Sequence, residues 1–203
     1  MKASKSVLSR RALWLSWFTV GYNTVEFVLS IVAGIMAGSA ALIGFGMDSL
    51  VESLSAGIMI WRFTPRKRLS EAQEEARERR AERLVGYSFL VLAGYVAYES
   101  IGKLVTAEAP QPSLFGIGIA IASIIIMPLL YRLKYTTGKS LGSRSLVADS
   151  KETLACAFLS VALLLGLGAN YLFGWWQADP VVGLIIVLFL LKEGIEIFRG
   201  EED

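Results

Sequence analysis

The sequence contains no histidine and only one cysteine, Cys156, among its 203 residues. A single cysteine excludes an intramolecular disulfide, and the absence of histidine removes the commonest zinc ligand and the usual proton relay. Any metal site must therefore use other donors. The formal net charge is only +2, and the Lys and Arg residues lie in a few short segments, which argues against nucleic acid as a partner.

Apolar residues, by contrast, are abundant, since they make up 54% of the chain and the mean hydropathy is +0.54. A run of about 20 apolar residues can cross a hydrocarbon core of roughly 30 Å. Such runs lie near 13–37, 40–61, 84–105, 113–131, 146–170 and 178–198. We therefore predict an all-α polytopic membrane protein, in which residues 1–203 form a single transmembrane domain of six helices with no soluble domain.

The placement of basic residues predicts how these helices cross the membrane. The second and fourth runs are followed by Arg62, Arg66, Lys67, Arg68, Arg132, Lys134, Lys139 and Arg144. Neither Lys nor Arg occurs in the connections on the other side, which are Gly38-Ser39, 107–113 and 174–180. By the positive-inside rule both termini are cytoplasmic, and we expect a bacterial inner membrane protein. The cytoplasmic loop over 63–83 is predicted to be partly helical, because Ser70 and Gln73 form a capping-box pattern.

Ionisable side chains recur inside two of the apolar runs. Asp48 and Glu52 are one helical turn apart in the second run, and Glu152 and Cys156 repeat this spacing in the fifth. An ionised side chain near mid-membrane costs about 2.5–3.5 kcal/mol, so it normally faces the bundle interior and pairs, protonates or binds an ion. At a rise of 1.5 Å per residue, Glu52 and Asp48 lie about 15 and 21 Å from Arg62 along the helix. Glu152 and Cys156 lie about 12 and 18 Å from Arg144, so the two pairs overlap in depth. The three carboxylates and the thiol are therefore predicted to meet near the midplane as ligands of a four-coordinate cation.

At these residues the sequence resembles the cation diffusion facilitator family of divalent metal/proton antiporters. Members typically have His or Asp, three residues, then Asp in the second span, and Ala-Asp-x-x-His-x-x-x-Asp in the fifth. The stretches here read Asp48-Ser-Leu-Val-Glu52 and Ala148-Asp149-Ser-Lys-Glu152-Thr-Leu-Ala-Cys156. Tyr98-Glu99 and Ala178-Asp179-Pro180 look like further family features.

The sequence departs from the family's pattern in two ways. Histidine is missing from both positions that often carry it, and Cys156 replaces a usual Asp. The family's C-terminal cytoplasmic domain, which usually binds metal and holds the dimer, has no counterpart in these residues. We therefore expect a homodimer that forms through membrane helices.

These features together predict a secondary transporter that exports a divalent transition metal, zinc or cadmium, in exchange for protons. Its partners would be the metal ion, protons and the lipid bilayer, without a prosthetic group and without enzymatic activity. An exporter of manganese, iron or cobalt with the same fold stays open, because carboxylates suit those metals too. A non-transporting membrane interaction protein, whose buried acids only specify helix pairing, also stays open.

Several residues have a second reading that the sequence alone does not decide. The second reading of Glu152 is an ion pair with its neighbour Lys151, and that of Cys156 is a small apolar filler. Asp149 either attracts cations or caps its helix. Asn23 and Glu26 either hydrogen-bond the metal ligands or carry protons to them, or they only form a hydrogen bond between helices.

Overall fold

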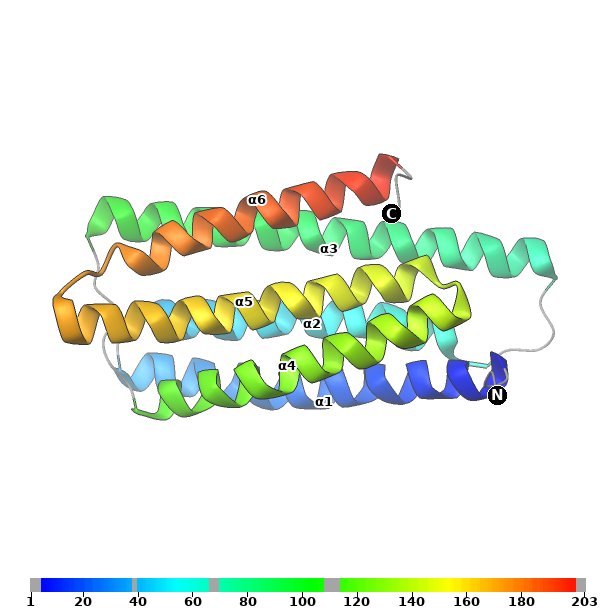
Figure 1. Ribbon diagram of the computed structural model, residues 1–203, viewed down its shortest axis with the longest axis horizontal. Coiled ribbons are helices and arrows are strands. Elements are labelled where there is room, and N and C mark those ends of the chain that lie inside the picture. Colours follow the sequence, from blue (N-terminus) through cyan, green and yellow to red (C-terminus); the bar gives the residue numbers. More distant parts are fainter. Residues whose placement is uncertain (1–4, 38–39, 66–69, 108–113, 200–203) are drawn as a thin grey trace.

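The computed structural model of the protein describes residues 5–37, 40–65, 70–107 and 114–199, and each predicted apolar run lies in a long α-helix (Figure 1). The helices are α1 (Lys5–Ala37), α2 (Ala40–Phe63), α3 (Glu71–Thr106), α4 (Leu114–Leu141), α5 (Arg144–Phe173) and α6 (Ala178–Arg199). The described part of the chain confirms the predicted all-α class. Outside it lie the predicted connection at Gly38-Ser39, most of the one at 107–113, and the basic residues Arg66, Lys67 and Arg68.

The predicted cytoplasmic helix and the third apolar run form one continuous helix, α3, of 36 residues. Ser70 is its N-cap. The backbone N–H of Gln73 donates to the Ser70 hydroxyl at 3.3 Å, and the Ser70 backbone N–H donates to the Gln73 side chain at 3.0 Å. The predicted capping box is thus confirmed, and it satisfies donors that a helix start leaves unpaired. α4 also continues beyond its apolar run, so that Lys134 and Lys139 lie on a helix rather than in a loop.

Helices that follow one another along the chain run antiparallel. The starts of α1, α3 and α5 and the ends of α2, α4 and α6 lie toward one end of the bundle, which we call the basic end (Figure 1). α1, α2, α5 and α4 pack in a ring in which each helix contacts the next. α3 packs against α2 and α5, and α6 packs against α3 and α5. α2 and α5 therefore lie at the centre, between the outer pairs.

The bundle has an apolar surface as well as an apolar core. Large apolar side chains face outward, and Trp14, Tyr98 and Leu114 are 71%, 80% and 89% exposed, whereas many serines, threonines and acids are buried. Such a surface fits lipid as the solvent. Stretches long and apolar enough to cross a membrane are found in four helices, as Lys5–Met36, Leu42–Phe63, Glu71–Thr106 and Leu114–Leu141. The chain is an integral membrane protein, and the count of six spans and the N-in, C-in topology stay predictions.

Candidate metal centre

The four predicted ligands lie on the two central helices. Asp48 and Glu52 are 3% and 0% exposed on α2, and Glu152 and Cys156 are 0% and 3% exposed on α5. Each pair is one helical turn apart, so both members of a pair point to the same side of their helix. α2 and α5 are antiparallel and in contact.

Contacts between side chains define the register of the two helices. The thiol of Cys156 hydrogen-bonds the carboxyl group of Asp48. One turn nearer the basic end, the Thr153 hydroxyl donates to Glu52 Oε1 at 2.7 Å. One further turn along, the Ser55 hydroxyl donates to Asp149 Oδ1 at 2.8 Å. This register agrees with the depths counted from the sequence.

Glu152 contacts a hydroxyl group. Its Oε2 accepts a hydrogen bond from the hydroxyl of Ser88 of α3 at 3.1 Å. Lys151, the partner considered for it from the sequence, forms an ion pair with Glu193 of α6, with Nζ 2.5 Å from Oε2. Glu152 therefore faces the bundle interior, and Lys151 faces α6.

Each of the three acids has one buried oxygen that accepts no hydrogen bond in the structure, namely Asp48 Oδ1, Glu52 Oε2 and Glu152 Oε1. A buried acceptor without a partner costs about 1–3 kcal/mol, more when it is charged, so these oxygens favour a proton or a cation. Within the described ranges, however, no three His, Cys, Asp or Glu side chains are arranged so that they could hold a metal ion. The structure brings the four residues onto one face but not into one coordination sphere, and their role as ligands stays a prediction.

A small cavity of about 50 Å³ reaches Asp48 from the end of the bundle opposite to the basic end. It is lined by α2, α3, α5 and α6, and its polar side chains include Glu99 and Lys103, which pair at 3.1 Å. Gly44 lies one turn from Asp48, and a Cβ there would collide with the Glu99 carboxylate. The glycine thus lets an acidic side chain lie against α2 on the approach to Asp48.

Toward the basic end, a buried ion pair lies directly next to the site. Lys134 of α4 and Asp149 of α5 are both 0% exposed, and Lys134 Nζ is 2.9 Å from Asp149 Oδ2. The sequence analysis placed Lys134 in the basic segment after the fourth run, and the structure shows that this residue is still on α4 with its side chain inside the bundle. Buried positions on α4 recur every three or four residues at Met127, Leu130, Lys134 and Thr137. That spacing is the signal that would have identified it.

Asp149 does not cap its helix, because α5 begins five residues earlier, at Arg144. Glu26, the other acid left undecided, accepts hydrogen bonds from Ser49 at 2.8 Å, from Tyr22 at 3.2 Å and from Ser123. These bonds join α1 to α2 and α4, as the interhelical reading of Glu26 expects. Asn23 is also buried, but neither its amide nitrogen nor its amide oxygen has a hydrogen-bond partner.

Two acidic side chains of α3, Glu78 and Glu82, are buried at the basic end. Glu78 accepts hydrogen bonds from the backbone N–H and the hydroxyl of Ser145 and from the hydroxyl of Ser143, each at 2.8 Å. Arg62 Nε of α2 lies 2.7 Å from Glu78 Oε2. Burial alone would raise the pKa of Glu78, but the Ser145 N–H, Arg62 and the two hydroxyls outweigh it and lower the pKa below its ordinary value. Glu78 therefore ties α3 to α2 and to the start of α5.

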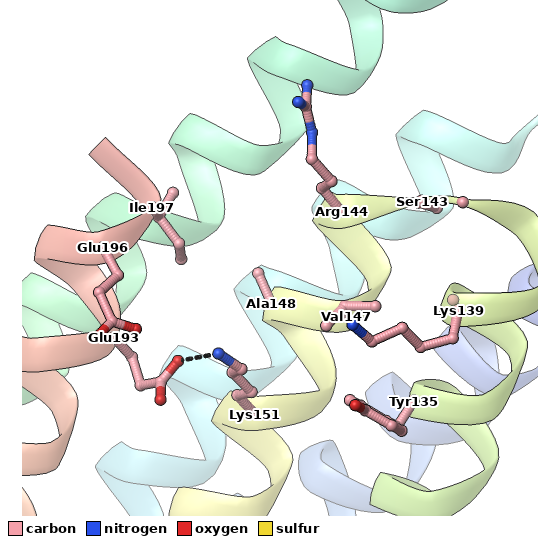
Figure 2. Close-up of a pocket in the computed structure, with 12 residues that line it drawn as sticks. Tyr135, Lys139, Ser143, Arg144, Val147, Ala148, Lys151, Glu193, Glu196 and Ile197 are labelled. Atoms are coloured by element: carbon pink, nitrogen blue, oxygen red, sulfur yellow. Dashed lines mark ion pairs between the residues drawn. The ribbon is translucent and has the colours of Figure 1, made fainter. Parts of the chain in front are cut away.

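A separate pocket of about 330 Å³ opens between α4, α5 and α6 at the basic end (Figure 2). Figure 2 shows Lys151 pointing toward Glu193 across it, with Lys139 and Arg144 on its rim. None of the four predicted ligands lines this pocket. The pocket is therefore distinct from the α2–α5 face.

Comparison with known proteins identifies the class of this chain. The family model of the cation efflux transmembrane domain matches residues 79–200. The chain therefore belongs to the cation efflux family, a family of transporters, as the motifs on α2 and α5 predicted.

Among individual relatives, Transmembrane protein 163 of Xenopus laevis is 27% identical over 189 residues, which cover 93% of this chain and 66% of that protein. A magnetosome protein, MamB of a Magnetospira species, is 26% identical over 91% of this chain and 62% of its own length. An uncharacterized transporter of Methanocaldococcus jannaschii is 26% identical over 86% and 63%. The chain thus spans less than two thirds of the length of these relatives.

Proposed function

We propose that this protein exports a divalent transition metal in exchange for protons, with Zn²⁺ or Cd²⁺ as the preferred cargo. The observation that carries the proposal is the α2–α5 face, where three buried carboxylates and a buried thiol lie within one to two helical turns of each other in a chain of the cation efflux family. Each carboxylate there keeps an oxygen without a hydrogen-bond partner. Asp48, Glu52, Glu152 and Cys156 are the proposed ligands.

The donor set explains the proposed preference. A thiolate is a soft ligand and favours Zn²⁺ or Cd²⁺, whereas three carboxylates alone would also suit Mn²⁺, Fe²⁺ or Co²⁺. Cys156 therefore decides between the two groups of metals. Binding requires Glu52 and Glu152 to rotate their free oxygens toward Asp48 and Cys156, since the side chains form two layers one turn apart.

The same donors couple the metal to protons. Carboxylates and thiols bind metal only after they lose their protons, so an arriving cation expels protons and arriving protons expel the cation. Release to the other side of the membrane then needs alternating access. The cavity that reaches Asp48 and the buried Lys134–Asp149 pair on the opposite side are consistent with a conformation that is open away from the basic end.

Two further parts of the proposal rest on the family resemblance and on the charge pattern. We propose a homodimer that forms through membrane helices, because large apolar side chains are exposed along them. We also propose residence in a bacterial inner membrane with both termini in the cytoplasm.

Transport into proteoliposomes tests the function. Reconstituted wild-type protein should take up Zn²⁺ or Cd²⁺ only when a pH gradient is applied, and Asp48→Asn should abolish uptake. Glu26→Gln is the matched control, because Glu26 is an equally buried acid that hydrogen-bonds outside the α2–α5 face. Uptake by Asp48→Asn at the wild-type rate would refute the site. A wild-type protein that neither binds nor moves metal would favour the interaction protein instead.

A further inference from the structure

The buried Lys134 ammonium contacts more than its partner Asp149. Besides the ion pair at 2.9 Å, Lys134 Nζ donates a hydrogen bond to Thr153 Oγ1 at 2.9 Å. Thr153 Oγ1 in turn donates to Glu52 Oε1 at 2.7 Å. An ammonium group can only donate, and a hydroxyl has one proton, so the direction of this chain is fixed from Lys134 through Thr153 to Glu52.

Among the buried residues that the structure describes, acids outnumber bases. Those residues include the acids Asp48, Glu52, Asp149 and Glu152 around the α2–α5 face, and Lys134 is the only base among them. A buried acid without a counter-charge is costly, so a fixed ammonium that pairs with Asp149 and also interacts electrostatically with Glu52 and Glu152 lowers the cost of an empty site. A divalent cation would supply the same counter-charge from within the site.

Thr153 also has a second acceptor. The backbone carbonyl oxygen of Asp149 lies 3.3 Å from Thr153 Oγ1, close enough to accept the hydrogen bond of the hydroxyl when Glu52 turns away. Glu52 can therefore leave its hydrogen bond with Thr153 without stranding a buried donor.

We infer that Lys134 is a built-in counter-cation of the metal centre, which competes with the transported metal for Glu52 through Thr153. This inference rests on the proposed function and assigns Lys134 a role in setting metal affinity. When the metal binds, Glu52 turns to it and the Lys134 ammonium is left with Asp149. When the metal leaves, Glu52 returns to Thr153. Asp149 restrains Lys134, since the ion pair holds the ammonium away from the ligands.

A comparison of two variants, which differ only in whether the buried ammonium is present, tests this role. Asp149→Asn keeps the hydrogen bond with Ser55 but frees the Lys134 ammonium toward Glu52. Lys134→Met with Asp149→Asn removes the ammonium in the same background. We expect the double variant to bind Zn²⁺ and Cd²⁺ at least about tenfold more tightly than Asp149→Asn, because a nearby unit charge of like sign opposes the divalent cation. The wild type should lie between them.

Titration calorimetry of the full-length protein in detergent measures these affinities. Alkylation of Cys156, the single cysteine of the chain, gives an independent readout, because bound metal should protect the thiol. Equal affinities in the two variants, with metal binding by the wild type, would overturn the role of Lys134 and leave the proposed function standing. A wild type that binds neither metal would overturn both.

Discussion

Glu78 should contribute more to stability than any exposed acid on the same helix. It receives three hydrogen bonds at 2.8 Å and an Arg62 ion pair at 2.7 Å, and it is only 6% exposed. Glu78→Gln keeps the shape of the side chain but removes its charge and one acceptor oxygen. Hydrogen bonds to a charged group contribute about 1.5–3 kcal/mol each, and a buried partner left unsatisfied adds to the loss. We therefore expect a destabilisation of about 3 kcal/mol.

Glu75→Gln is the matched control for this prediction. Glu75 lies on the same helix and pairs with Arg79 and Arg144, each at 3.3 Å, but its side chain is 51% exposed. Exposed ion pairs contribute about 0–1 kcal/mol, because water screens them. Both variants should insert and carry out metal binding, since neither residue lies on the α2–α5 face.

Reversible unfolding in mixed detergent micelles, followed by far-UV circular dichroism, measures the two free energies of unfolding. Glu78→Gln should shift the midpoint strongly and Glu75→Gln should hardly shift it. A loss in Glu78→Gln no larger than in Glu75→Gln would refute the reasoning, because it would mean that the contacts of Glu78 are exchanged for water without cost.

Three further predictions concern pH, selectivity and access. Folding lowers the pKa of Glu78 from 4.5, so the ionised carboxylate stabilises the folded protein fully above about pH 4.5. This stabilisation is lost as the pH falls through the folded-state pKa, and the difference in unfolding free energy between wild type and Glu78→Gln should therefore close only in acid. Cys156→Ser should lower the ratio of Cd²⁺ to Zn²⁺ uptake in proteoliposomes, and an unchanged ratio would argue against a thiolate ligand. Gly44→Ala should slow uptake while costing less than about 1 kcal/mol of stability, because the new Cβ displaces only the flexible end of Glu99 toward the cavity at Asp48. Wild-type uptake by this last variant would show that metal does not pass that cavity.

The sequence predicted the central face of the bundle because two simple rules apply there. A spacing of four residues places Asp48 with Glu52, and Glu152 with Cys156, on one side of a helix. The positive-inside rule fixes the direction of each helix, so a count of residues places Asp48 and Cys156 at similar depths. The structure brings these two side chains into contact. Which rotamers the acids adopt, and hence whether they surround one ion, depends on packing that neither rule describes.

The same rule of basic residues gives no sign that the side chain of Lys134 is buried. A lysine after an apolar run counts as evidence for a cytoplasmic loop, although a buried acid on a neighbouring helix can hold it inside the bundle. Residue type is also a poor guide to burial on α3, where Glu78 and Glu82 stand in a run of charged residues. They nevertheless continue the buried stripe of Val85, Phe89 and later residues at intervals of three or four. In both cases the period of burial, and not the type of residue, carries the information.

The absence of histidine gives a physical reason for a buried lysine next to the proposed site. A neutral imidazole offers a metal ligand without charge, so a site that contains histidine is less negative when it is empty. A site built from three carboxylates and a thiol has no such neutral donor, and its empty state therefore needs either protons or a fixed positive charge nearby. Lys134 supplies that charge from the side of the basic end, next to Asp149. A transporter without histidine should thus show metal affinity that depends on a lysine outside its ligand set.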